Sequence, residues 1–247
     1  MGSWLSRLLP APASSHAAEF DAVLAAAHVD GLVVFASWLA IFGMILVRFR
    51  AGAGRTPGAA AGRWPLVAIA AVVLGDVWLL AGSALPAWWH RSAPAPAGAA
   101  EVRVVGEQYA WNVHYPGLDG AFGRTDPARI TAADPIGIDR EDAAGRDDFV
   151  LINLLVVPEG RPTVVHLVAK DVIHSFTLAE MRVKQDVVPG LPTATWFTPT
   201  ATGVWEIGCS QLCGLGHYRM RGVFEVRTAD AWQAFVRDEV ALVKPPA

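Results

Sequence analysis

The chain has 247 residues, of which 53% are hydrophobic and 17% are charged, and its formal net charge is −3. The chain has no excess of basic residues of the kind that bind nucleic acid, so no nucleic-acid partner is expected. The sequence contains two cysteines, which excludes a scaffold held together by several disulfides. The high apolar content must therefore come from local hydrophobic runs or from an unusually large core.

Two hydrophobic runs stand near the N-terminus. Residues 31–47 contain no charged residue, and residues 65–87 contain one, Asp76. About 20 apolar residues cross the roughly 30 Å hydrocarbon core of a bilayer as a helix. The second run reaches that length alone, and the first does so when it is extended back by three residues. We therefore expect a transmembrane helical hairpin over residues 28–91, which follows an N-terminal segment, residues 1–27.

The charges around the hairpin predict its orientation. The short connection between the runs carries four arginines and no acidic residue: Arg48, Arg50, Arg55 and Arg63. Short loops that are rich in arginine stay on the cytoplasmic side. We expect a multi-pass protein of the plasma (inner) membrane whose remaining chain lies on the periplasmic, extracytoplasmic side. An ionised Asp76 inside the bilayer would cost at least ~2.5–3.5 kcal/mol, so this hairpin should not face lipid all round.

The composition changes after the hairpin. Residues 92–100 read as a semi-rigid Pro/Ala linker. From residue 92 onward, 19 acidic residues outnumber 14 basic ones, so the outer part is acidic. Short β-like segments rich in Val, Ile and aromatics follow, separated by Pro, Gly and Asp. They are residues 102–106, 109–115, 149–157, 163–170, 175–178, 204–208 and 222–227.

This spacing predicts an all-β sandwich or barrel domain over residues 101–228. Residues 116–148 are expected to form a long surface excursion. The tail, residues 229–247, contains an amphipathic helical pattern at 229–243.

Three further side chains receive structural interpretations. His166 lies in a Val-rich segment and is expected to be packed, His114 is expected to be exposed, and Met181 is expected in the core.

Metal-binding residues gather near the end of the predicted domain. Cys209, Cys213, His217 and Met220 lie within twelve residues, and His174 lies upstream in a segment that can fold beside them. Soft sulfur combined with imidazole selects copper or zinc over magnesium or calcium.

Three interpretations of this cluster compete. A structural zinc site would have enough donors, but the spacing is not that of a zinc finger and Met220 would be idle. A Cys209–Cys213 disulfide would leave the histidines and Met220 without a role. A copper centre uses every donor. A single blue-copper ion needs one cysteine, so the second points to two thiolates that bridge two coppers, each with one histidine.

The second cysteine is also where a family resemblance becomes specific. The span from Asp171 to Met220 contains H-S-F, R-V-K-Q-D-x-x-P-G and C-x₃-C-G-x₂-H-x₂-M in that order. It resembles the binuclear CuA domain of cytochrome c oxidase subunit II. The preceding hairpin and the Q-x-x-W segment at 108–111 are similar to the same family, over residues 28–228 in all. The resemblance implies a cupredoxin-like sandwich.

The resemblance also implies a role for each donor. Cys209 and Cys213 would bridge two copper ions, and His174 and His217 would each bind one of them. Met220 and the backbone carbonyl of Gln211 would be weak ligands, one to each metal. The family commonly has Glu in place of Gln211, where its carboxylate helps to hold magnesium at the interface with the catalytic subunit. No C-x-x-C-H haem attachment motif occurs, so no haem is expected on this chain.

Electron transfer follows from the same resemblance, with no bond chemistry at this subunit. The family usually shows Q-W-x-W, whose first Trp receives the electron from cytochrome c. Here Tyr109 takes that position, so Tyr109 and Trp111 are the candidates for electron entry. The implied partners are cytochrome c or a similar donor, the haem-copper catalytic subunit I, and further oxidase subunits. The implied enzyme is cytochrome c oxidase, an oxygen-reducing and proton-translocating complex.

Two other functions remain open from the sequence. One is the equivalent CuA subunit of a nitric oxide reductase, which has a different terminal acceptor. The other is a membrane-tethered copper-delivery protein with a thioredoxin-like fold, which also uses C-x₃-C and a distant histidine. Such proteins lack the His217/Met220 pair and need alternating helices and strands.

Overall fold

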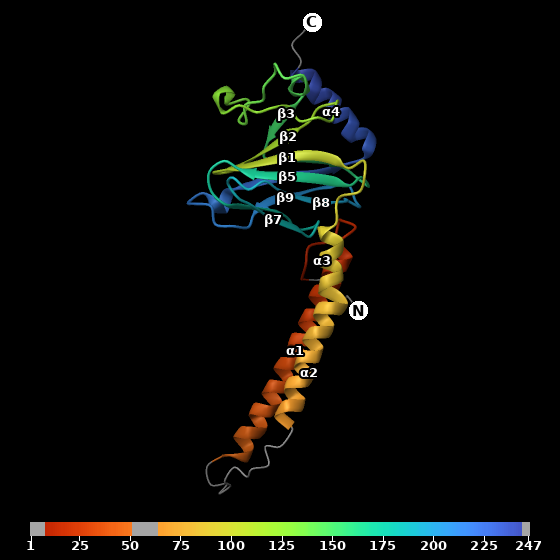
Figure 1. The fold of residues 1–247 in the computed structure, drawn as a ribbon, viewed down its shortest axis with the longest axis vertical. Coiled ribbons are helices and arrows are strands. Elements are labelled where there is room, and N and C mark those ends of the chain that lie inside the picture. Colours follow the sequence, from red (N-terminus) through yellow and green to blue (C-terminus); the bar gives the residue numbers. More distant parts are fainter. Residues whose placement is uncertain (1–7, 51–63, 244–247) are drawn as a thin grey trace. The chain divides into compact units, whose positions relative to one another are not determined.

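The computed structural model describes residues 8–50 and 64–243 (Figure 1). It divides into two compact units, one containing Ala18–Ala93 and the other containing Pro10–Ala17 with the chain from Pro94 onward. Arg55 and Arg63 of the predicted cytoplasmic connection lie outside the described residues, as do the two ends of the chain.

The first unit is helical. It consists of α1 (Ala17–Arg48), α2 (Trp64–Leu79), the π-helical turn η2 (Leu80–Ala84) and α3 (Leu85–Ser92). Two stretches, Ala17–Arg48 and Leu66–Ser92, are long and apolar enough to cross a membrane, and their most hydrophobic windows are not buried within the protein. Helix α1 begins eleven residues before the predicted hairpin, because the preceding segment is rich in alanine, the strongest helix former.

The π turn has a local cause. Pro86 has no N–H to donate and its ring crowds the carbonyl four residues before it, which disrupts an α-helix. The turn η2 (Leu80–Ala84) precedes this proline, and the N–H of Leu85 donates to the carbonyl of Leu80. The helix therefore accommodates Pro86 by forming a wider, π-helical turn and then continues into α3.

The second unit is a sandwich of two five-stranded sheets. One sheet has the order β3-β2-β1-β5-β8, and the other β4-β10-β9-β6-β7. The strands of the first are β1 (Ala100–Glu107), β2 (Ala110–Tyr115), β3 (Phe149–Ile152), β5 (Thr163–Ala169) and β8 (Thr193–Phe197). Those of the second are β4 (Leu154–Pro158), β6 (His174–Leu178), β7 (Val183–Val187), β9 (Gly203–Cys209) and β10 (Arg221–Arg227).

Most strand pairs are antiparallel, while β1–β5 and β4–β10 are parallel. The expected combination of two apolar helices and a β-sandwich is confirmed.

Aromatic side chains fill the space between the sheets. Trp111 of β2 meets Phe176 of β6 edge to face at 5.6 Å between ring centroids, and Phe197 meets Phe224 at 5.8 Å. All four are fully buried, and so is Met181, as predicted. The alternation of each strand places these residues inward, which gives the two sheets one continuous core.

The segment 149–157 was predicted as one strand, and this was wrong. It forms β3 and β4, which belong to different sheets, and Asn153 between them has a left-handed backbone with φ of 58°. Asn153 tolerates this conformation better than most residues. Its backbone N–H donates to the Trp111 carbonyl and its side-chain oxygen accepts from the Trp111 N–H. The carbonyl of Asn153 accepts from the N–H of Val223 in β10, so the chain changes sheets at a residue that is bonded to one strand of each sheet.

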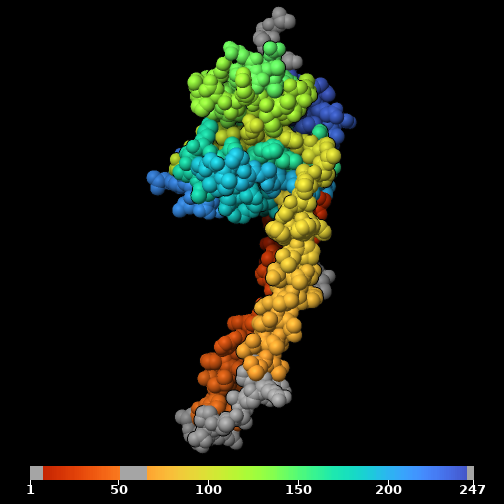
Figure 2. All heavy atoms as spheres, in the orientation of Figure 1, coloured from red at the N-terminus to blue at the C-terminus, as the bar shows by residue number. Residues whose placement is uncertain are grey.

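The predicted surface excursion covers one end of the sandwich and includes the short turns η3 (Pro127–Arg129) and η4 (Ala144–Arg146) (Figure 2). It is anchored by His114, whose Nε2 lies 2.6 Å from Oδ2 of Asp148. The prediction that His114 is exposed was wrong, since its side chain is fully buried. The reason is that the excursion folds back over β2 and supplies a carboxylate for the imidazole.

His166 lies on the outer face of β5, and its side chain is 40% exposed rather than packed in the core. It pairs with Glu101 of β1 at 3.0 Å. The tail forms α4 (Ala229–Val243), which packs Phe235, Val236 and Val240 against the sandwich.

Candidate metal centre

The strands that carry His174 and Cys209 are neighbours in the second sheet. His174 is the first residue of β6 and Cys209 is the last residue of β9, and these strands pair through Phe176 opposite Cys209. Strand β9 also pairs with β10, so residues 210–220 form the loop that joins two adjacent strands. This loop carries the remaining candidate donors, so the fold brings all six predicted residues to one end of the second sheet.

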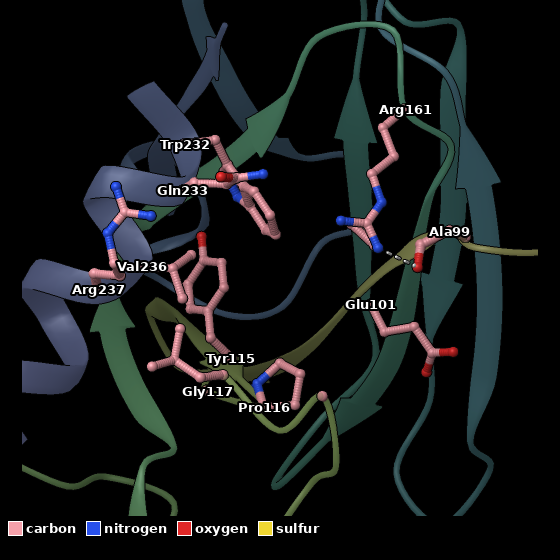
Figure 3. A pocket seen from close by; sticks show the side chains of 13 residues that line it. Ala99, Glu101, Tyr115, Pro116, Gly117, Arg161, Trp232, Gln233, Val236 and Arg237 are labelled. Carbon is pink, nitrogen blue, oxygen red and sulfur yellow. Dashed lines mark hydrogen bonds between the residues drawn. The ribbon is translucent and has the colours of Figure 1, made fainter. Parts of the chain in front are cut away.

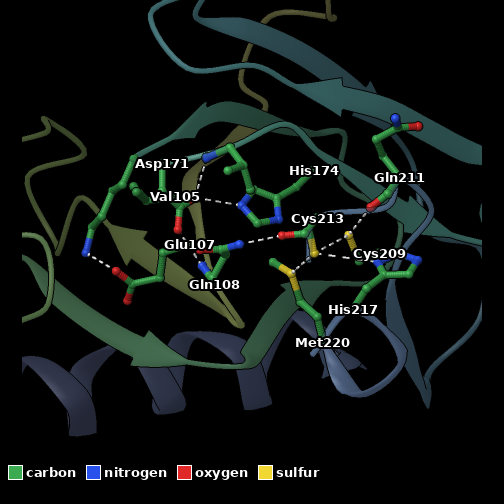
Figure 4. Close-up of polar contacts among 12 residues, drawn as sticks. Val105, Glu107, Gln108, Asp171, His174, Cys209, Gln211, Cys213, His217 and Met220 are labelled. Carbon is green, nitrogen blue, oxygen red and sulfur yellow. Dashed lines mark hydrogen bonds and ion pairs between the residues drawn. The ribbon is translucent and has the colours of Figure 1, made fainter. Parts of the chain in front are cut away.

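The sulfur atoms form the middle of this cluster (Figure 4). Both cysteines are free, and their Sγ atoms lie 3.9 Å apart, well beyond the length of a disulfide bond. Sγ of Cys213 lies 3.5 Å from Nδ1 of His217 and 3.6 Å from Sδ of Met220. Sγ of Cys209 lies 3.3 Å from the carbonyl oxygen of Gln211.

His174 faces the sulfur atoms from the other side. Its donor atom and both Sγ atoms lie within 4.8 Å of one another, the spacing of groups that can share a metal ion. The imidazole is buried, and its Nε2 lies 2.9 Å from Oδ1 of Asp171. Its Nδ1 is buried without a hydrogen-bond partner among the described residues. A buried nitrogen that lacks a partner is costly unless a bound ion completes it, so the site is chemically incomplete as a purely protein structure.

Asp171 fixes the orientation of that imidazole. Its carboxylate accepts hydrogen bonds from the backbone N–H groups of Gln108 and Val172, each at 2.7 Å. Histidine ligands of metals commonly donate their second ring N–H to a carboxylate in this way. The sequence motifs did not assign Asp171 a role. Its position three residues before His174 is the signal that could have identified it.

The pKa values of the two thiols are shifted in opposite directions. Burial disfavours the thiolate of Cys209, but the neighbouring His174 imidazole and backbone groups at Ser175 and Gln211 outweigh burial and lower the pKa of Cys209 to about 6. Burial and the nearby Cys209 charge raise the pKa of Cys213 to about 11. One sulfur thus ionises readily while the other keeps its proton. A bound cation would favour the second thiolate, so metal binding and proton release are coupled here.

The aromatic segment, residues 108–111, packs directly on the ligand loop, residues 210–220. A Cβ at Gly216 would lie 2.5 Å from the Tyr109 ring, and one at Gly214 would lie 2.6 Å from its hydroxyl. Gly214 also has a φ of +134°, which strongly favours glycine. Nε2 of Gln108 donates to the carbonyl of Cys213 at 2.6 Å. These contacts make β1, the aromatic segment and the ligand loop one packed structure. The Q-x-x-W pattern predicted a place in a motif for Gln108 but not this contact with the loop.

The two aromatic candidates lie in different surroundings. Tyr109 is partly exposed, whereas Trp111 is fully buried and meets the His174 ring edge to face at 5.9 Å. Around the loop, Leu212, Leu215 and Tyr218 are 75–97% exposed. A docking protein can therefore reach Tyr109 and the loop, but it cannot touch Trp111.

Comparison with known proteins agrees with this architecture. The family described as cytochrome c oxidase subunit II, periplasmic domain, matches residues 100–226. This chain belongs to the cytochrome c oxidase subunit II family. The match covers β1 to β10, except the last residue of β10, and every candidate donor described above. Together with the two apolar helices, it identifies a membrane protein with an extracytoplasmic domain.

Individual relatives carry the same name. The chain is 38% identical over 152 residues to an alternative cytochrome c oxidase subunit 2 of Bradyrhizobium diazoefficiens, covering 61% of this chain and 55% of the relative. It is 32% identical over 147 residues to a subunit 2 of Cereibacter sphaeroides, covering 55% and 48%.

The periplasmic domain of subunit II (CoxB) of Bradyrhizobium japonicum superposes with a TM-score of 0.45 at 26% identity, covering 60% of this chain and 98% of that domain. The chain spans about half the length of the Bradyrhizobium diazoefficiens and Cereibacter sphaeroides relatives.

Proposed function

We propose that this chain is the electron-transfer subunit of a haem-copper cytochrome c oxidase and holds a binuclear copper centre. The observation that carries the proposal is the pair of free thiols 3.9 Å apart, flanked by two imidazoles, a thioether and a carbonyl. Such soft donors suit copper. The residues present would suit two ions, with Cys209 and Cys213 as the ligands that both ions would share. His174, His217, Met220 and the Gln211 carbonyl complete the donor set. When bound, this copper pair would accept and release one electron at a time.

The protein's own part is to hold the donors still. Asp171 and the buried β6 strand fix His174, and the bond from Gln108 fixes the carbonyl of Cys213. Burial of Cys213, Met220 and His174 keeps water away from their donor atoms. A centre whose ligands move little between redox states transfers electrons quickly, and a rigid sandwich provides that stability.

We propose that electrons enter through Tyr109, which lies against the backbone of the ligand loop. Trp111 is buried beside His174 and would act as packing or as an inner part of the path. The donor would be cytochrome c or a similar carrier, attracted by the acidic outer part. The acceptor would be haem-containing subunit I, which reduces oxygen within a proton-translocating complex that has further subunits. The location would be the plasma (inner) membrane, with the copper domain on the periplasmic side.

The copper-delivery alternative agrees less well with the fold. A thioredoxin-like protein alternates helices and strands, whereas the described outer unit has ten strands in two sheets and one C-terminal α-helix. Zinc would leave Met220, which is 3.6 Å from a thiol, without a function. Nitric oxide reduction differs in the acceptor, so only a functional measurement separates it from oxygen reduction.

The test is to purify the full chain with the subunits that accompany it and to record haem spectra and gas consumption with reduced cytochrome c. We expect oxygen uptake that slows as salt is raised, because salt screens the attraction between acidic surface and basic carrier. Tyr109→Leu should slow oxidation of the carrier while the copper content stays unchanged. A complex without haem, or one that consumes nitric oxide and not oxygen, would contradict the proposal.

A further inference from the structure

A cavity of about 450 Å³ lies beneath helix α4, far from the metal centre (Figure 3). Its walls are α4, the start of β1, the turn after β2, and Arg161, which follows β4. The volume is in the range of small-molecule sites. The cavity touches Ala100, whereas the metal centre touches Gln108 just beyond the other end of β1, about 26 Å away along the strand at ~3.3 Å per residue. It is therefore a separate feature of the sandwich.

Arg161 is held in place on one wall. Its Nε donates to the carbonyl of Gly98 at 2.8 Å, and its Nη2 donates to the carbonyl of Ala99 at 3.2 Å. The guanidinium carbon lies 5.5 Å from the centre of the Trp232 ring on the α4 side. No contact among the described residues engages Nη1. Figure 3 shows this guanidinium reaching across the cavity toward α4, so a fixed cation presents unused donors to the open space.

The opposite wall also carries donors without acceptors. The side chains of Arg237 and Gln233 on α4 make no hydrogen bond or ion pair with the described residues, and the buried Nε1 of Trp232 has no partner there. The one carboxylate in the lining, Glu101, is paired with His166. The Tyr115 hydroxyl donates to the carbonyl of Val156 and accepts from its N–H, so it offers the cavity only its ring.

We propose that this cavity binds a small oxyanion, a carboxylate or a phosphate, that is carried on an apolar or aromatic body. The free edge of Arg161 would donate to the anion, since guanidinium groups match carboxylate and phosphate geometry. Arg237 would add a second positive charge at the rim. The rings of Trp232 and Tyr115, with Val236, would cover the apolar body. The domain as a whole is acidic, so these uncompensated arginines stand out from their surroundings.

The test uses ¹⁹F NMR line broadening with the full chain in phosphatidylcholine nanodiscs. The probes are 4-fluorobenzoate and 4-fluorophenyl phosphate, with neutral 4-fluorobenzyl alcohol for comparison. We expect the anions to bind and the alcohol not to bind. Arg161→Gln should weaken binding about 10-fold or more, the effect of losing a charge-assisted hydrogen bond. Arg237→Gln should also weaken it, and this exposed residue has no contacts whose loss would disturb folding.

Arg129→Gln is the matched control, because it removes the same charge from the surface excursion and should leave binding unchanged. Absence of binding at millimolar probe, equal binding of the alcohol, or binding that neither Arg161→Gln nor Arg237→Gln weakens would overturn the proposal. If phosphatidylglycerol nanodiscs displace the probes and phosphatidylcholine nanodiscs do not, the site is supported and an anionic lipid headgroup is the source of its ligand. If they do not, while the arginine variants act as expected, the site is supported for a soluble anion. Neither result depends on copper.

Discussion

Asp171 shows how a single carboxylate organises the metal centre. It receives one hydrogen bond from the aromatic segment at Gln108, one from its own turn at Val172, and faces Nε2 of His174. Burial works against its charge, but these contacts together hold the pKa of Asp171 below its ordinary value. The carboxylate is thus ionised and oriented before any metal binds. Because Asp171 contacts Nε2 of His174, Nδ1 is the ring atom that remains available to a metal.

Asp171→Asn should weaken copper binding by about 10- to 100-fold, the usual effect of losing the outer partner of a histidine ligand. The amide can still accept one backbone N–H, so the turn should keep its fold. Competition between the full chain and a copper chelator measures the affinity. Asp238→Asn, an exposed carboxylate on α4, is the control. Equal copper affinity in Asp171→Asn and the unmodified protein would show that Asp171 does not hold the ligand.

The glycines of the ligand loop have a specific packing role. Gly208, Gly214 and Gly216 stand at or near the turn that carries the donors. In the structure, side chains at Gly214 and Gly216 would collide with Tyr109. Gly208 has a Cβ position with ordinary van der Waals space and no unusual φ. Gly214 and Gly216 are therefore required for close packing of the Tyr109 ring, which no local pattern encodes, and Gly214 is also required by its φ of +134°.

At the scale of elements, the sequence predicted most strands and missed the points where the chain changes direction. Alternating Val, Ile and aromatic residues were sufficient for β1, β2, β5, β9 and β10. Strand β8 (Thr193–Phe197) was missed because it is short and rich in threonine. The run 149–157 looked continuous because nearly all its residues are apolar. Its division depends on Asn153 bonding to Trp111, forty-two positions away, which is a tertiary contact.

The buried contact between His114 of β2 and Asp148 of the surface excursion makes the stability of the folded domain depend on pH. Burial lowers the pKa of His114, and its contacts with the Asp148 carboxylate only partly oppose this, while the nearby Arg103 cation adds to the lowering. Folded His114 is therefore neutral at pH values where an unfolded histidine is already protonated. The unfolded chain then binds more protons, so stability is complete above about pH 6.5 and falls as the pH drops below it.

We expect this loss to reach at most about 1.4 kcal/mol per pH unit and to be centred on the excursion. Hydrogen exchange at the Gly123 amide, which donates to Asp148 at 2.8 Å, reports opening of this contact. His114→Gln, compared at each pH, removes the titrating group but keeps a hydrogen-bond donor. A pH dependence of opening that is identical in the variant and the unmodified chain would rule out His114 as its source.

At the scale of the whole molecule, composition alone separated a helical unit from a β unit. The two long helices expose apolar side chains along their length, which suits lipid or partner helices rather than water. The outer unit buries its own apolar residues and brings the donors together at one end. The candidate donors could be proposed from the sequence because they lie mostly in one loop, and their role as ligands stays a prediction. The contact of Asp171 with His174 and the cavity beneath α4 were not predicted, because each depends on segments that are distant in the sequence.

The proposed electron transfer depends on two bridging thiolates that hold two copper ions. Electron paramagnetic resonance of the oxidised, copper-loaded full chain, combined with elemental analysis, tests it most directly. We predict two coppers per chain and one unpaired electron whose hyperfine splitting arises from both nuclei. Cys209→Ser should abolish that signal, whereas Met220→Leu should keep both metals and shift the reduction potential. A spin confined to a single copper nucleus, or a silent protein that contains zinc, would contradict the account.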